Sequence, residues 1–197
     1  MNGLSLDCIF KKKLVSTRLS MGRICQTQLS KLERGNMEKQ INEKIREIAQ
    51  SVNETIPVAW DNLFINISLA FDGGEVYYFF NEEGKNEYIY NLYIPKRYGI
   101  PNLEFRNQER RTFRLAWELR EIFEKEGQPL WTSCTIKVIG TKLSAEFDYT
   151  PWNESDYSSG QQMDFFEYKY LGKQPANEKE LEQFKAMEAF QQEHNGK

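Results

Sequence analysis

The residues of this chain that could carry chemistry are concentrated in residues 146–164, where carboxylates are interleaved with large aromatic side chains. Two carboxylates on one face of a strand, such as Glu146 and Asp148, can act as general acid and base or hold Mg²⁺. Aromatic residues among acids have another use, because aromatics anchor protein interfaces and acids speed encounter with a basic partner. The cluster comprises Glu146, Asp148, Tyr149, Trp152, Glu154, Asp156, Tyr157 and Asp164.

Two interpretations of this cluster do not involve catalysis. In the first, the cluster is a protein-binding surface, with Tyr149, Trp152 and Tyr157 as anchors and with Asp148, Glu154 and Asp156 steering the partner. In the second, Tyr149 and Trp152 complete the core and the acids are solvated loop residues. The interface is the hypothesis carried forward, and its six residues are the predicted binding site.

Other signatures of catalysis are missing from the sequence. The one histidine, His194, lies in the polar C-terminal tail, so a Ser-His or Cys-His pair and a histidine-ligated zinc site have no obvious member. Cys134 lies in an alternating segment, where a lone cysteine is typically a buried apolar residue. Gly73 and Gly74 precede a strand and not a helix, which makes them turn residues and not a phosphate cradle. The sequence predicts no catalytic residue, no metal and no cofactor.

Composition and charge limit the class of protein. The 197 residues are 40% apolar and 28% charged, which is typical of a globular domain, and no apolar run is long enough to span a bilayer. Three cysteines without a CxxC pair favour a reducing compartment, so the cytoplasm is expected. The formal charge is -3, but residues 1–36 hold seven basic and two acidic residues, which leaves -8 for residues 37–197. An acidic body disfavours nucleic acid as a partner and suits a basic protein.

The basic segment 1–36 is predicted to be an extension outside a single domain that spans residues 37–197. Lys11, Lys12 and Lys13 are not followed by the apolar region of a secretory signal. Three interpretations stay open: a disordered tail, a contact with membrane or nucleic acid, or a stretch upstream of the native start. Met37, directly before a strongly periodic segment, favours the last of these.

Periodicity predicts the elements that position the cluster. Apolar residues at helical spacing predict helices over residues 41–52, with Asn36 as a candidate cap, over 103–126 and over 177–190. Strict alternation predicts strands over residues 63–71, 75–81, 88–94, 132–139 and 143–149, joined by tight turns. Residues 151–162 are expected to form a loop, and 163–171 fit either a strand or a helix. The order α-β-β-β-α-β-β-α indicates an α+β fold: an antiparallel five-stranded sheet, made of a meander plus a hairpin, with helices packed on one face. Trp60 and Trp131 are assigned to its core.

A series of short motifs resembles the YezG/EsaG-like immunity proteins. No single motif is specific, but their order and spacing together are, and they run from about Met37 to about Phe190. The motifs are Ile-Pro-Val-Ala-Trp at 56–60, Gly-Gly-Glu-Val-Tyr-Tyr-Phe at 73–79, Ile-Pro-Lys-Arg-Tyr at 94–98, Trp-Thr-Ser-Cys at 131–134, Phe-Asp-Tyr at 147–149, and the segment 160–172 with its Phe-Glu-Tyr-Lys-Tyr core.

The resemblance implies a cytoplasmic antitoxin. Such a protein would bind the C-terminal nuclease domain of a toxin exported by the type VII secretion system, in a 1:1 complex, with no contact to nucleic acid or membrane and no enzymatic activity of its own. The charge of the body fits, because a DNA-cleaving domain attracts phosphates with basic residues that an acidic inhibitor can cover. Two alternatives stay open: a small metal-dependent hydrolase that uses Glu146 and Asp148, and a structural adaptor with a different partner.

Overall fold

The structure is a computed structural model that describes residues 17–20 and 31–195. Helix α2 (Lys31–Asn53) forms because apolar residues recur at three- and four-residue spacing and give it one continuous apolar face. The predicted helix is confirmed, but it begins at Lys31, so Asn36 lies inside it and does not cap it. The fully buried residues of this face include Met37, Ile41, Ile45, Ile48 and Val52.

Helix α4 (Asn102–Lys125) packs beside α2 and confirms the second predicted helix. Its buried face includes Phe105, Leu119 and Phe123. A buried hydrogen bond of 2.8 Å joins the hydroxyls of Ser51 and Thr112 across the helix pair. Because both helices carry an apolar stripe, together they form one layer that covers a sheet.

The sheet contains the five predicted antiparallel strands, β2 (Trp60–Leu69), β3 (Gly74–Glu82), β4 (Tyr88–Tyr90), β5 (Ser133–Ile139) and β6 (Lys142–Asp148). Strands β2 and β4 end earlier than predicted. Strand β2 ends at Leu69, so Phe71 lies beyond it and is 98% exposed. Strand β4 ends at Tyr90, where the chain turns into the short helices η1 (Asn91–Tyr93) and α3 (Ile94–Tyr98).

A sixth strand, β1 (Thr17–Ser20), pairs in parallel with β6 and completes the order β1-β6-β5-β2-β3-β4. Strand β1 and the first turn of α2 lie within the segment that the sequence analysis set apart as an extension. The interpretation of residues 1–36 as non-native stays a prediction. The basic cluster Lys11 to Lys13, Cys8 and Cys25 lie outside the described residues.

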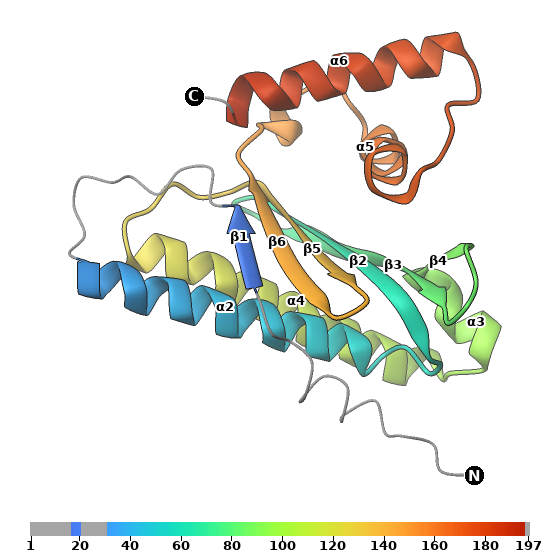
Figure 1. The fold of residues 1–197 in the computed structure, drawn as a ribbon, viewed down its shortest axis with the longest axis horizontal. Helices are drawn as coiled ribbons and strands as arrows, with labels where there is room; N and C mark the ends of the chain where they lie inside the picture. Colours follow the sequence, from blue (N-terminus) through green and yellow to red (C-terminus); the bar gives the residue numbers. More distant parts are fainter. Residues whose placement is uncertain (1–16, 21–30, 196–197) are drawn as a thin grey trace.

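Helices lie on both sides of the sheet, which the sequence analysis did not anticipate. Figure 1 shows α2 and α4 beneath the sheet and a second, C-terminal layer above it. That layer consists of η2 (Trp152–Glu154), α5 (Ser159–Phe166), the π-helical turn η3 (Glu167–Leu171) and α6 (Glu178–Asn195). The segment 163–171 is therefore helical, and the expected loop contains η2 and the start of α5, which Ser158 and Gln161 cap reciprocally.

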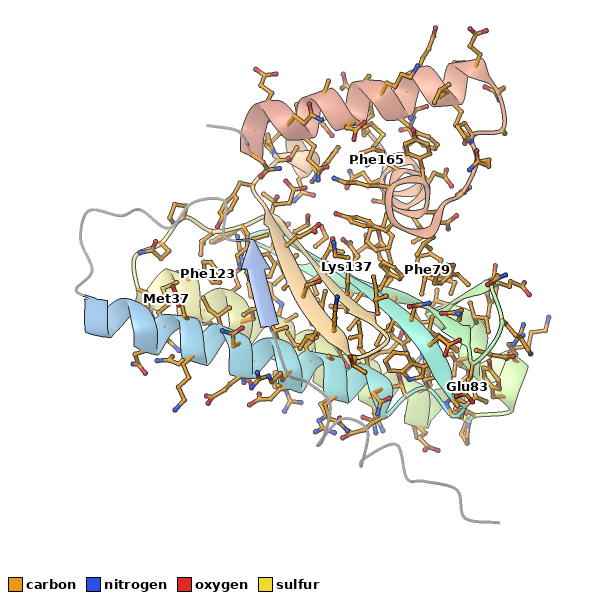
Figure 2. All side chains as sticks on the ribbon, in the orientation of Figure 1. Met37, Phe79, Glu83, Phe123, Lys137 and Phe165 are labelled. Carbon is orange, nitrogen blue, oxygen red and sulfur yellow. The ribbon has the colours of Figure 1, made fainter. Side chains whose placement is uncertain are left out.

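The two faces of the sheet differ because successive side chains of a strand point to opposite sides. The inner face is apolar and packs on α2 and α4, with Phe123, Trp131 and Phe147 in mutual ring contact. On the outer face, Phe166 of α5 contacts the rings of Tyr77 and Phe79. Figure 2 shows the corresponding placement of Phe123 on the side of the lower helices and of Phe165 in α5.

The β2–β3 turn needs its second glycine for a steric reason. The sequence analysis placed Gly73 and Gly74 at the turn, but neither has the positive φ by which glycines often serve turns. A Cβ on Gly74 would lie 2.1 Å from the Ser68 carbonyl oxygen and 2.9 Å from the Leu69 Cα, whereas a Cβ on Gly73 would meet nothing within 4 Å. The backbone of β2 therefore approaches Gly74 too closely for any other residue.

We predict that Gly74→Ala lowers the free energy of unfolding by about 1–3 kcal/mol, because backbone atoms must move to admit the methyl group. Gly73→Ala is the matched control and is expected to change stability by less than about 0.5 kcal/mol. Urea unfolding of the two variants measures the difference. Equal stabilities would show that the turn relaxes without cost.

Candidate functional site

Two rows of polar side chains cross the outer face of the sheet. Residues paired between neighbouring strands point to the same face, so the strand register places these side chains in line. The first row is Glu75, Ser68, Ser133 and Asp148, and the second is Tyr77, Asn66, Thr135 and Glu146. Together the two rows form a polar floor on the outer face, whereas the inner face of the sheet is apolar.

The C-terminal layer covers this floor and leaves a cleft of about 420 Å³. Both polar rows line the cleft. Strand residues supply the floor, while α5, η3 and α6 supply the roof, through side chains such as Phe166, Lys169 and Gln191. The volume lies within the range of 300–1,000 Å³ that is usual for ligand sites, and the mixture of aromatic walls and a few polar groups is also typical.

A buried carboxylate, that of Asp148, holds the roof to the floor. Asp148 is 8% exposed and accepts six hydrogen bonds. Its Oδ1 accepts from the backbone N–H of Thr150 at 2.8 Å, the Thr150 hydroxyl at 2.5 Å and Asn195 Nδ2 at 2.7 Å. Its Oδ2 accepts from Trp152 Nε1 at 2.8 Å, Gln191 Nε2 at 2.6 Å and the Ser133 hydroxyl at 3.4 Å. One side chain thus connects β5, β6, η2 and α6.

The hydrogen bonds keep this carboxylate ionised. Burial acts to raise the pKa of Asp148, but the bonds from Thr150, Asn195 and Trp152 together outweigh burial and hold the pKa below its ordinary value. Asp148 is therefore a saturated acceptor, and its position in the free protein is inside and not at the surface.

Glu146, in the neighbouring row, is also bonded. It forms an ion pair with Lys137 and accepts a hydrogen bond of 3.1 Å from the Tyr170 hydroxyl. The ammonium of Lys137 also lies 5.3 Å from the centre of the Tyr170 ring. Burial first, and then the charge of Glu146, raise the pKa of Tyr170 to well above its ordinary value.

The structure separates the six predicted binding residues into three groups. Asp148 and Trp152 are brought together by a hydrogen bond, and both are buried, with Trp152 only 7% exposed. Tyr149 and Tyr157 are half-buried, and the Tyr157 ring contacts those of Trp152 and Phe190. Glu154 and Asp156 are exposed. Of the proposed steering acids, Asp148 is therefore shielded from a partner in the free protein, while the other two are available to it.

Sequence reasoning missed the floor residues of the central strands, above all Asn66, Ser68 and Thr135. Their signal was present in the alternation of β2 and β5, but a polar strand face is ordinarily solvated. Only the C-terminal layer makes this one a cleft. The residues assigned to the core lie there, with Trp131 and Cys134 fully buried and Trp60 half-buried, its Nε1 donating to Asn53 Oδ1 at 3.0 Å.

The described residues contain no group of three or more His, Cys, Asp or Glu side chains placed to hold a metal ion. Within that same part of the chain, no helix combines the length and the apolar character that crossing a membrane requires. The arrangement suits recognition, with polar groups on a floor between aromatic walls and with the exposed acids Glu154 and Asp156 in the adjoining residues 152–157, called the η2 segment below.

Comparison with known proteins defines the class as immunity proteins. The model of a family described as immunity protein YezG-like matches residues 41–185, and the chain belongs to this family. Among its relatives, the immunity protein YezG of Bacillus spizizenii is 31% identical over 131 residues, which cover 66% of this chain and 81% of the relative. The type VII secretion system protein EsaG of Staphylococcus aureus is 28% identical over 154 residues, which cover 78% of this chain and 94% of the relative.

We predict that Asp148→Asn lowers the free energy of unfolding at pH 7 by about 2–4 kcal/mol, because an amide replaces a charged acceptor and turns its NH₂ group toward buried donors. The folded-state pKa lies below the ordinary value of 3.8, so the contribution of the carboxylate is complete above that value. It is lost as the pH falls through the folded-state pKa.

Urea unfolding at pH 7 and at about pH 3 tests this expectation. The stability gap between the parent and Asp148→Asn should narrow at the lower pH. Asp156→Asn, an exposed acid a few residues further along the chain, should behave like the parent at both values. A gap of constant size would assign the loss to shape and not to charge.

Proposed function

We propose that this immunity protein neutralises the nuclease domain of a toxin exported by the type VII secretion system, and that it does so by binding alone. Membership of the YezG-like immunity protein family carries the proposal. The type VII connection rests on the relative EsaG, whose name places it in that system and whose length the match covers to 94%. The nuclease is inferred from charge and from the resemblance described above.

The charge of residues 37–197 supports a basic partner. This part of the chain carries a formal charge of -8, and it includes the exposed acids Glu154 and Asp156. A nuclease must collect basic residues to hold phosphates, so its substrate-binding surface is complementary to an acidic inhibitor. An inhibitor on that surface excludes DNA and needs no bond-making chemistry of its own.

We further propose a 1:1 complex formed in the cytoplasm. A stable complex of standard size buries about 800 Å² on each partner. The proposed contact surface lies on the side of the sheet that the C-terminal layer covers. It consists of the η2 segment with Glu154 and Asp156, the half-buried rings of Tyr149 and Tyr157, and the rim of the cleft. Trp152 and Asp148 support this surface from within.

Co-purification tests the proposed function. The full chain is expressed together with the C-terminal nuclease domain of a toxin of the type VII secretion system, and the complex is then assayed for cleavage of plasmid DNA. The expected result is a 1:1 complex with no nuclease activity, and activity that returns when the immunity protein is removed. A free nuclease domain that cleaves DNA at the same rate with and without this chain would overturn the proposal.

If the exposed acids steer the partner, the double reversal Glu154→Lys, Asp156→Lys should slow association by about tenfold at low salt and flatten its salt dependence. Glu83→Lys, Glu124→Lys changes the net charge equally at exposed acids outside the η2 segment and is the matched control. Stopped-flow association at several salt concentrations measures both. If both double variants slow association equally, the steering comes from net charge alone, and the η2 acids are not part of the contact surface.

A further inference from the structure

The cleft contains a buried amide that the fold itself does not use. Asn66, in the middle of β2, is 9% exposed and lines the cleft. Among the described residues, its side chain forms no hydrogen bond, whereas its strand neighbours place Tyr77 on one side and Thr135 on the other. The fold does not enclose the polar atoms of this side chain completely, so solvent in the cleft reaches the amide, and the amide is free to bond a ligand there.

A second group without a bonding partner lies beside it. Glu75 lines the cleft and is exposed to solvent, and within the described part of the chain its carboxylate has no ion pair or hydrogen bond, in contrast to the bonded Glu146 and Asp148. Desolvation by the surrounding protein raises the pKa of Glu75. Ser68 pairs with Glu75 across the strands, and Asn66 lies two residues from Ser68 on the same face of β2, so a carboxylate, a hydroxyl and an amide line one part of the floor.

Among the described residues, the ring of Tyr170 is already occupied by the cations Lys137 and Lys169, whereas the rings of Tyr77 and Phe166 have no cation on them. Tyr77 and Phe166 meet edge to face, with ring centres 5.5 Å apart, and both line the cleft. The Lys169 ammonium lies 5.4 Å from the centre of the Tyr170 ring and bonds to Gln191 at the rim, which holds it to the roof. The faces of aromatic rings attract positive charge, and a guanidinium stacks on them more readily than an ammonium does.

We propose that the cleft binds an arginine side chain of the partner protein. A guanidinium has five donors in a planar fork and no acceptor, which matches a floor that presents the Glu75 carboxylate, the Ser68 hydroxyl and the Asn66 amide oxygen. Lysine offers only a compact, strongly hydrated charge that cannot bond along such a row while stacking on the walls. An anion in the cleft would face the Glu75 carboxylate, while the Lys169 ammonium that also lines the cleft is engaged by Gln191 and the Tyr170 ring.

The inference rests on the proposed function for the identity of the partner. In a nuclease domain, an arginine on the substrate-binding surface holds phosphate, and its capture in the cleft would remove a phosphate ligand as well as cover the surface. Binding of the side chain itself can be tested without the toxin.

The test titrates the ¹⁵N-labelled full-length chain with N-acetyl-L-arginine methylamide and follows amide signals by NMR. We expect saturable shifts at Asn66, including its side-chain NH₂, with a dissociation constant on the order of 1 mM. The citrulline counterpart has nearly the same shape without the charge, and the lysine counterpart carries the charge without the fork. Both should bind at least about tenfold more weakly. Equal binding of either would overturn the proposal.

Two substitutions locate the binding groups, and a third serves as the control. Glu75→Gln should weaken the arginine probe by about tenfold, whereas Glu83→Gln, at an exposed acid outside the cleft, should weaken it by less than about twofold. Asn66→Leu should abolish binding while leaving the melting temperature unchanged or higher, because a leucine has no unmet hydrogen bonds. A structural role for Asn66 would instead lower the melting temperature. If Glu75→Gln binds the arginine probe as tightly as the parent does, the proposed arginine site is wrong.

The two proposals fail separately. Suppose that the chain binds and inhibits the nuclease domain, and that Asn66→Leu and Glu75→Gln bind both the probe and that domain as the parent does. The arginine site is then wrong, and the proposed function stands. If the probe binds as described and the nuclease domain does not, the cleft is an arginine site for a different partner.

Discussion

The burial of one ionised carboxylate underlies the architecture of this protein. Asp148 lies at the end of β6, where the sheet gives way to the C-terminal layer, and its two oxygens are bonded by groups from β5, η2 and α6. A charge in this position is stable only when its acceptor sites are filled. The requirement to fill them fixes where the last turns of α6 meet the sheet, and so holds that end of the roof over the cleft.

The alternation of the strands assigns different tasks to the two faces of the sheet. The inner face buries apolar side chains against α2 and α4 and supplies stability. The outer face is apolar where Phe64, Tyr77 and Phe79 pack together with Phe166, and it is polar along the cleft. The same segment that carries the exposed acids Glu154 and Asp156 also contributes Trp152 to the cleft. Charge at the surface and acceptors in the cleft thus belong to one side of the molecule, which suits recognition of one basic partner.

Periodicity predicted the three long helices α2, α4 and α6 and the five antiparallel strands because their apolar patterns are local. It failed where tertiary contacts decide. Asn36 has the side chain of a helix cap but lies inside α2, and Leu92 and Ile94 continue an alternating pattern in which the chain in fact turns into η1 and α3. Residues 163–171 are aromatic at nearly every other position, and only packing on the outer face and on α6 selects a helix. A parallel edge strand as short as β1 has no detectable pattern of its own.

For the site, the sequence by itself determined the inventory: an acidic body, a cluster of acids and aromatics before the last helix, and no histidine or cysteine arrangement for catalysis. It also determined the motif order by which the family is recognised. Only the tertiary structure decided which of these groups a partner can reach. Asp148 and Trp152 turn inward because they satisfy each other, while Asn66 and Glu75, far from the cluster in sequence, meet in one cleft through strand register. Whether a side chain is buried, and whether its hydrogen bonds are formed, depends on segments that are distant in the chain, so no local sequence pattern contains this information.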